Sequence, residues 1–202
     1  MIYNSIDSCR FVPVEEVQRA ALRQQFGVPA DATVFCFVGS GFERKGLASA
    51  IRAIAGTAAW LIVVGQDKAE RRYRDLARSL GCEGQIRFLG MQKETLPFYQ
   101  LSDGLLLPTL YDPFPNVILE AMACGLPVIT STSCGGAEFI EQGQNGFSCD
   151  ALDISTLKEA IAATPSLNNN NNMGLAARER VKEATPEKLS SQLISLYQKL
   201  LD

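Results

Sequence analysis

The sequence predicts an α/β fold: a Rossmann-like, doubly wound parallel sheet covered by helices. Short apolar runs alternate along the chain with longer stretches of helical character, an order typical of a parallel sheet flanked by helices. The first run, TVFCFV at 33–38, is apolar throughout, as in a strand buried on both faces. Glycines close several elements, such as Gly65 after a strand and Gly81 and Gly125 after helices.

The elements follow one another in a regular order from the first strand onward. Each expected strand is a short apolar run, and the strands are placed at 33–38, 60–64, 85–89, 104–107, 127–131 and near Phe147. Each expected helix is a longer segment between such runs, and the helices are placed at 15–26, 44–55, 68–80, 93–102, 115–124, 135–142, 154–163 and 186–201. The order of these units indicates the doubly wound sheet.

The chain of 202 residues is long enough to bury a substantial core. We expect residues 1–30 to form a linker and a lead-in helix, residues 31–165 the Rossmann-like domain, and residues 166–202 a low-complexity run followed by a C-terminal helix. An α/β domain that starts after a linker suggests that another part of the parent protein precedes it. The five asparagines at 168–172 are either natural low complexity or placeholders for poorly defined residues.

Charge and composition exclude several classes of function. The net charge of −3 provides no excess of Lys and Arg for nucleic acid, so no nucleic-acid partner is expected. The chain has no histidine and its six cysteines form no C-x-x-C pair, so we expect no metal site and no histidine-based catalysis. The cysteines are expected to be free and mostly buried in a reducing cytosol, and a disulfide scaffold is the weaker alternative.

The N-terminus lacks the pattern of a signal peptide, and the apolar runs are too short to span a bilayer. We therefore predict a cytoplasmic protein. Attachment of the full-length protein to the inner face of the cell membrane, as a peripheral membrane protein, stays open.

The first candidate site is the loop between the strand at 33–38 and the next helix. It contains Gly39, Ser40 and Gly41, followed by Arg44 and Lys45. A helix start offers backbone N–H groups and a positive dipole end to a phosphate, and the two cations would neutralise a diphosphate without a metal. The loop matches neither G-x-G-x-x-G nor the P-loop. The alternative is a glycine turn with a solvated Arg–Lys pair.

The second candidate site joins two acids eight positions apart, Asp112 and Glu120. Asp112 follows a strand, and the amides of Asn116 and Val117 lie at the start of the next helix, where backbone donors are unpaired. Glu120 lies in an otherwise apolar helix, where a carboxylate is costly unless it has a hydrogen-bonding partner. Vicinal ribose hydroxyls would be such a partner. The alternative is a pair of acids satisfied by backbone or solvent.

A third glycine pair, Gly135 and Gly136, allows close approach either to a ligand or to a neighbouring strand. All three candidate sites lie at the carboxyl ends of expected parallel strands, where doubly wound folds bind their ligands. Their coincidence at one edge favours a ligand site over three separate turns.

These motifs carry a resemblance. The chain resembles the C-terminal, donor-binding half of the retaining GT-B glycosyltransferases of family 4, the group 1 glycosyltransferases. The most specific motif is the segment from Asp112 to Glu120 followed by AMACG, which resembles the E-x7-E motif of the family. Within the family, the segments 39–46 and 63–68 and the loop at 134–135 are most similar to lipopolysaccharide core glucosyltransferases.

The resemblance implies a role for each matching residue. Arg44 and Lys45 would hold the donor diphosphate, Glu120 would bind the ribose hydroxyls, and Asp112 would contact the transferred sugar. Asp112, Lys45 and Arg44 would thus form the catalytic group. The other substrate-binding positions would act mainly through the main chain: Asn116 and Val117 at the distal phosphate, Met91 at the base, and Gly39 and Ser40 along the cleft.

Two positions depart from the family pattern. Asp112 stands where glutamate is usual, so its side chain is one methylene shorter, and Pro115 precedes Asn116 where the family commonly has glycine and leucine. Pro115 offers no N–H group, but the amides after it remain available if it opens the helix.

The resemblance implies an enzyme that transfers a hexose, glucose from UDP-glucose, to a lipopolysaccharide-core or related glycan acceptor. No cofactor is expected, because the nucleotide-sugar is the substrate. The acceptor would bind a missing N-terminal domain, so this chain alone would be inactive. A mannosyltransferase that uses GDP-mannose and a non-catalytic nucleotide-sugar-binding module are the alternatives. GT-B epimerases rely on histidine, which this chain lacks.

Overall fold

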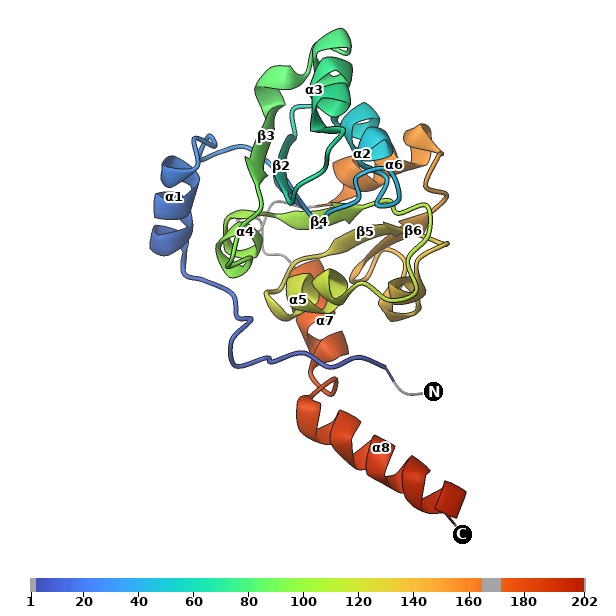
Figure 1. Ribbon diagram of the computed structural model, residues 1–202. Coiled ribbons are helices and arrows are strands. Elements are labelled where there is room, and N and C mark those ends of the chain that lie inside the picture. The colour runs from blue at the N-terminus through green and yellow to red at the C-terminus, as the bar shows by residue number, and fades with distance from the viewer. Residues whose placement is uncertain (1–2, 165–171, 202) are drawn as a thin grey trace.

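The computed structural model describes residues 3–164 and 172–201, and it contains a six-stranded sheet in the order β3-β2-β1-β4-β5-β6 (Figure 1). Every adjacent pair of strands is parallel. The strands are β1 (Val34–Val38), β2 (Trp60–Val64), β3 (Ile86–Gly90), β4 (Gly104–Leu107), β5 (Val128–Ser131) and β6 (Gly146–Cys149). This is the strand order of a doubly wound Rossmann sheet, so the predicted fold class is confirmed.

Helices cover both faces of this sheet. Figure 1 shows α2, α3 and α6 on one face and α4, α5 and α7 on the other, while α8 extends away from the body. The helices are α1 (Glu16–Gln25), α2 (Leu47–Ile54), α3 (Glu70–Ser79), α4 (Leu96–Leu101), α5 (Asn116–Ala123), α6 (Ile154–Ala163), α7 (Asn172–Val181) and α8 (Pro186–Leu201). Two short 3₁₀ helices, η1 (Glu83–Gln85) and η2 (Gly135–Phe139), complete the elements.

The core lies along the central strands. All residues of β1, β4 and β5 are buried, as continuous apolar runs covered by helices on both faces require. The expected free cysteines agree with the structure, in which all six are unpaired and only Cys9 is exposed. The disulfide alternative is therefore wrong.

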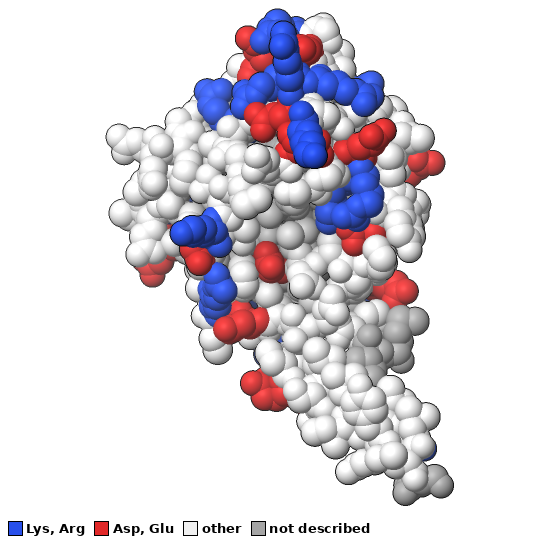
Figure 2. Space-filling model, viewed as in Figure 1, with Lys and Arg blue, Asp and Glu red and all other residues white. Residues whose placement is uncertain are grey.

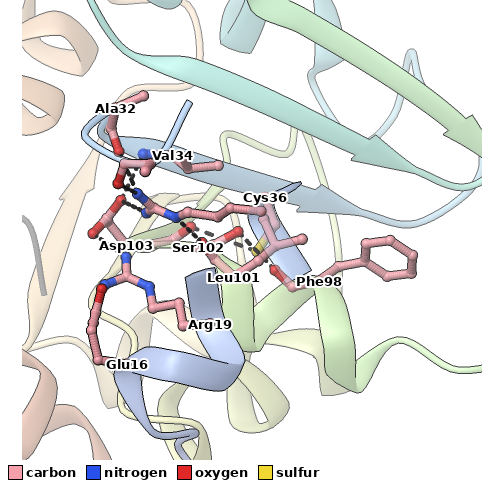
Figure 3. A network of polar contacts seen from close by, with 12 residues as sticks. Glu16, Arg19, Ala32, Val34, Cys36, Phe98, Leu101, Ser102 and Asp103 are labelled. Carbon is pink, nitrogen blue, oxygen red and sulfur yellow. Dashed lines mark hydrogen bonds and ion pairs between the residues drawn. The ribbon is translucent and has the colours of Figure 1, made fainter. Parts of the chain in front are cut away.

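The lead-in helix α1 is fastened to the sheet by a buried ionic network (Figure 3). Arg19 and Arg23 each form an ion pair with Asp103, at 2.5 and 2.7 Å, and none of the three residues is more than 3% exposed. Asp103 also accepts a hydrogen bond of 2.7 Å from the amide of Val34, the first residue of β1. The network thus joins α1 to the amino ends of β1 and β4, which the sequence did not suggest.

One helix start differs from the prediction. The helix expected at 44–55 begins at Leu47, and Arg44 and Lys45 lie in the preceding turn. Gly46 has φ 75°, and the turn closes through hydrogen bonds from the amides of Lys45 to Gly41 and of Leu47 to Phe42. These two amides are used within the turn and are therefore not available to a phosphate.

Other boundaries agree within a few residues. The segment expected to be helical at 135–142 is a 3₁₀ helix that ends at Phe139. Of the asparagines at 168–172, those at 168–171 lie outside the described residues, and Asn172 begins α7. The division at residues 30 and 165 stays a prediction. Across 3–164 and 172–201, none of the helices combines the length and apolar character needed to cross a membrane.

Charged side chains of both signs are intermixed on the outer surface of α3. Figure 2 shows blue and red side chains together at the upper end of the molecule, where Figure 1 places α3. Arg74 pairs with Glu70 at 2.8 Å, and Arg78 pairs with Asp75 and Glu83 at 2.8 and 2.9 Å. These arginines are therefore largely neutralised by their neighbours.

Candidate functional site

The candidate site lies at the carboxyl edge of the sheet, where the loops after β1, β4 and β5 meet. β1 and β4 are neighbours, with Phe35 opposite Gly104 and Cys36 opposite Leu105. The chain continues from β1 to β2 on one side and from β4 to β5 on the other, so the strand order reverses between them. Such a switch point is where open α/β sheets bind their ligands.

Across this switch point, the basic pair after β1 meets the acid after β4. Lys45 Nζ and Arg44 Nη1 lie 2.7 and 2.8 Å from the same oxygen of Asp112, Oδ2. Lys45 is 8% exposed and Asp112 7%, whereas Arg44 is exposed and also donates to the carbonyl of Tyr111 at 3.2 Å. The sequence predicted these three residues as site residues, and the structure brings them into direct contact.

The two cations also change the acidity of Asp112. Burial alone would raise the pKa of this carboxyl group, but the hydrogen bonds and charges of Lys45 and Arg44 outweigh burial and lower it below its ordinary value. Asp112 is therefore ionised at neutral pH, and the cluster carries a net positive charge.

Backbone contacts hold the two loops together. The carbonyl of Arg44 accepts hydrogen bonds of 2.8 Å from both the hydroxyl of Thr109 and the amide of Leu110. A Cβ atom on Gly46 would lie 1.8 Å from the carbonyl oxygen of Pro108. Only glycine fits this close approach, so Gly46 allows the turn that carries the basic pair to lie directly on the loop after β4.

Gly39 and Ser40 belong to the same loop after β1 as the basic pair. A Cβ on Gly39 would lie 3.3 Å from Cε of Lys45, so the glycine makes room for the lysine stem. Ser40 is exposed, and its hydroxyl oxygen accepts a hydrogen bond of 3.2 Å from the amide of Gln66. Asp67, which the sequence reasoning missed, accepts a hydrogen bond of 2.8 Å from the amide of Phe42 and fixes the loop after β1.

The loop after β5 supports Asp112 from the other side. The amide of Gly135 donates to the carbonyl of Asp112 at 2.9 Å, and Asp112 forms a parallel bridge with Cys134. A Cβ on Gly135 would lie 1.6 Å from the carbonyl oxygen of Pro113. Two roles were considered for this glycine, close approach to a ligand or to a neighbouring strand. The structure shows a close approach to the neighbouring segment at Pro113.

Asn116 and Val117 begin α5, with Pro115 as the preceding cap. Their amides are the first two of helix α5. As predicted, the helix contains no carbonyl group four positions earlier that could accept a hydrogen bond from either amide. The side chain of Asn116 accepts a hydrogen bond of 2.7 Å from Asn4, which ties the N-terminal segment to this helix start.

Glu120 lies partly exposed on α5 and is bonded to α4 instead of to the basic pair. The hydroxyl of Tyr99 donates to Oε2 of Glu120 at 2.6 Å, and the hydroxyl of Thr95 lies 3.5 Å from the same oxygen. Tyr99 was missed by the sequence reasoning. Thr95 belongs to the segment that follows β3, and this segment also contains Met91, which is 71% exposed.

The site has no cluster typical of a bound metal. Within 3–164 and 172–201, no three side chains of Cys, Asp or Glu lie close enough together to hold a metal ion. The charged groups in direct contact at this edge are instead two cations and one acid, Arg44, Lys45 and Asp112, while Glu120 is bonded to Tyr99 on α4.

Comparison with protein families gives one match that covers most of the chain. Residues 18–188 match the family of glycosyl transferases group 1. LpsE of Rhizobium meliloti (strain 1021), a lipopolysaccharide core biosynthesis glycosyltransferase, is 36% identical over 142 residues, which cover 69% of this chain and 41% of LpsE. The lipopolysaccharide glucosyltransferase WaaG of Escherichia coli (strain K12) is 32% identical over 159 residues, covering 73% of this chain and 42% of WaaG.

Solved structures share the fold. A crystal structure of WaaG, a glycosyltransferase involved in lipopolysaccharide biosynthesis, superposes with a TM-score of 0.79 at 26% identity, covering 90% of this chain and 51% of that one. Anabaena Alr3699/HepE in complex with UDP and glucose superposes with a TM-score of 0.83 at 23% identity, covering 98% of this chain and 56% of that one. The chain thus spans about half the length of the proteins that it matches.

Proposed function

Because the chain belongs to the group 1 glycosyltransferases, we propose that it is the donor-binding domain of a retaining glycosyltransferase and binds a nucleoside diphosphate sugar at the carboxyl edge of its sheet. The contact of Lys45 and Arg44 with Asp112 carries this proposal. It places two positive charges and one carboxylate at the switch point of the sheet, and a diphosphate joined to a sugar requires both kinds of group.

In the proposed complex the diphosphate lies against Arg44 and Lys45. Departure of the nucleoside diphosphate leaves negative charge on its terminal phosphate. The two cations and the amides of Asn116 and Val117 would stabilise this charge. The cations supply the neutralisation that a metal ion provides in other transferases, so the proposed reaction is metal-independent.

Asp112 would act on the sugar. The anomeric carbon develops oxocarbenium-like positive charge as the leaving group departs, and a nearby carboxylate stabilises that charge. A hydroxyl of the acceptor then attacks the anomeric carbon from the face that the leaving group vacates and gives its proton to an oxygen of the departing diphosphate, so the configuration is retained. Glu120 would bind the ribose hydroxyls, and the segment with Met91 would contact the base.

For the substrates, we propose UDP-glucose as donor and a lipopolysaccharide-core or related glycan as acceptor. WaaG is named a lipopolysaccharide glucosyltransferase and LpsE a lipopolysaccharide core glycosyltransferase, and HepE binds UDP and glucose. The acceptor would bind a further domain, so the chain alone would bind donor without turnover. The proposed reaction takes place in the cytoplasm.

The shorter acid at position 112 favours a second candidate function, that of a binding module without catalysis. A carboxylate held by Lys45 and Arg44 at 2.7 and 2.8 Å is already engaged, so a binding module that retains the nucleotide-sugar pocket without catalysis also fits the geometry. A mannosyltransferase that uses GDP-mannose differs from the first proposal only in base and sugar.

Calorimetry with UDP, GDP and ADP tests the proposed site. We expect the chain to bind UDP, and Lys45→Ala to weaken binding by at least about tenfold, since a hydrogen bond to a charged group contributes about 1.5–3 kcal/mol. Lys199→Ala is the matched control, because Lys199 is exposed in the last turn of α8, and it should leave the affinity unchanged. Absence of binding by all three nucleotides, or equal losses in the two variants, would contradict the proposal.

A further inference from the structure

Glu120 is the one charged residue of an otherwise buried stretch of α5. Ile118, Leu119, Ala121 and Met122 on either side of it are all 0% exposed. Glu120 itself is only partly exposed, and a partly buried carboxylate is costly unless hydrogen-bond donors reach it. Its orientation is therefore decided by the donors that reach it.

The donor that reaches Glu120 most closely is Tyr99. Its hydroxyl lies 2.6 Å from Oε2, and Thr95 reaches the same oxygen only at 3.5 Å. Over the described part of the chain, Oε1 accepts no hydrogen bond. One carboxylate oxygen is thus held and the other is left for a ligand.

Tyr99 is itself held firmly. The residue is 0% exposed, and its ring meets the ring of Phe11 edge to face with centroids 6.1 Å apart. Phe11 is buried as well, so the N-terminal segment closes over the tyrosine. Burial, together with the charge of Glu120, raises the pKa of Tyr99 well above its ordinary value. The hydroxyl therefore keeps its proton and remains a donor to Glu120.

We propose that Tyr99 is a positioning residue for ribose recognition: it fixes Oε2 of Glu120 so that the carboxylate is presented to the vicinal hydroxyls of the donor ribose. This inference rests on the proposed function, because it assumes that a nucleotide occupies the site. Tyr99 does not touch the ligand. It acts by preorganising an acceptor pair, which removes the entropy that a mobile glutamate would lose on binding.

The test compares ribonucleotides with deoxyribonucleotides. Calorimetry measures the affinity of wild type and Tyr99→Phe for UDP, GDP and ADP and for their 2′-deoxy forms. We expect Tyr99→Phe to weaken binding of the ribonucleotide by about five- to tenfold, the range for loss of one hydrogen bond. Binding of the 2′-deoxy form should change less than about twofold, so the preference for ribose falls.

Tyr73→Phe is the matched control. Tyr73 is also buried, on α3, and its ring packs against Phe42, so its substitution removes a buried hydroxyl at a distance from Glu120. It should leave the preference for ribose unchanged. Phe11→Leu is a second arm in case Tyr99→Phe does not fold, since it keeps the hydroxyl and loosens the ring. It should reduce the ribose preference in the same direction and by less.

The outcomes separate the two proposals. If wild type binds none of the three nucleotides, the proposed function fails. If wild type binds and prefers the ribonucleotide, and both Tyr99→Phe and Phe11→Leu retain that preference, the role of Tyr99 is overturned and the donor site stands. Equal loss of ribonucleotide and deoxyribonucleotide binding would also overturn the role of Tyr99, because the effect would then be structural. A wild type that binds both forms equally overturns it too.

Discussion

Nζ of Lys45 lies 2.7 Å from Oδ2 of Asp112, and both residues are almost completely buried. Arg44 shares the same oxygen at 2.8 Å from the solvent side. Asp112, which stands where the resemblance to the family leads us to expect glutamate, therefore holds the basic pair in place. The charge that we propose for diphosphate binding is kept in a fixed position by this carboxylate, which lowers the reorganisation that binding requires.

Asp112→Asn should destabilise the fold. The amide keeps the shape of the side chain but removes its charge, so the buried ammonium of Lys45 loses its anionic partner while Arg44 remains near it. We expect a loss of about 1–3 kcal/mol in the free energy of unfolding, measured by urea denaturation. Glu94→Gln is the control, since it breaks the exposed pair with Arg10, and it should change stability by less than about 1 kcal/mol. A loss no larger than that of the control would contradict a structural role for the carboxylate.

The contribution of Asp112 should depend on pH in a defined direction. The pKa of this carboxyl group is lower in the folded chain than its ordinary value of about 4. Its stabilisation is therefore complete above about pH 4 and is lost as the pH falls through the lower, folded value. The difference in unfolding free energy between wild type and Asp112→Asn should be largest near pH 7 and should shrink toward pH 3. A difference that stays constant over this range would rule out the ion pairs as its source.

The fold was predictable because its information is local. The run at 33–38 is apolar at every position, and the strand found there, Val34–Val38, is buried at every position. The family was predictable for a similar reason, because the motif from Asp112 to Glu120 is continuous in sequence. The match of residues 18–188 to the group 1 glycosyl transferases confirms the family. The start of α2 was not predictable, since Gly46 adopts φ 75° to fit against Pro108, which lies far away in sequence.

The contacts within the site could be predicted only in part. The edge of the sheet where Arg44, Lys45 and Asp112 lie followed from the topology, but their sharing of one carboxylate oxygen depends on the pairing of β1 with β4. Tyr99 and Asp67 were missed because their partners lie 21 and 25 positions away in sequence. A tyrosine within the short apolar helix Leu96–Leu101 was the available signal, since a buried hydroxyl needs a polar partner.

Gly46→Ala should be far more damaging than an alanine at another left-handed glycine. Gly46 has φ 75° and its Cβ would lie 1.8 Å from the carbonyl oxygen of Pro108, whereas Gly81 has φ 69° with open space around it. We expect Gly81→Ala to cost about 1 kcal/mol from backbone strain alone. Gly46→Ala should cost at least about 3 kcal/mol, because the loops must also move apart. Similar unfolding midpoints in urea for the two variants would show that the loops separate without strain.

Asp103→Asn should destabilise the chain more than any surface charge change. Asp103 is 0% exposed and accepts from Arg19, Arg23 and the amide of Val34 (Figure 3). Neutralising it removes the buried carboxylate that both guanidinium groups share, and breaking a buried ion pair in this way costs about 3–5 kcal/mol. Asp75→Asn, which affects only exposed pairs on α3, should stay within about 0.5 kcal/mol. Comparable urea midpoints for the two variants would contradict a stabilising role for the network.

The cysteines give a prediction about both reactivity and alkaline stability. Cys9 is exposed and the other five thiols are buried, so a thiol reagent at pH 8 should label one site rapidly and the rest only on unfolding. Rapid labelling of two or more thiols in the native chain would contradict the buried assignment.

Burial raises the pKa of Cys36 to about 12, so this thiol stays protonated in the fold at a pH where the unfolded chain ionises it. Since the folded pKa is the higher one, the stabilisation is present below about pH 8.5 and declines as the pH rises toward the folded value. Cys36→Ala should weaken that decline between pH 9 and 11, whereas Cys9→Ala should leave it unchanged. An equal decline of stability in wild type and Cys36→Ala would rule out the Cys36 thiol as its source.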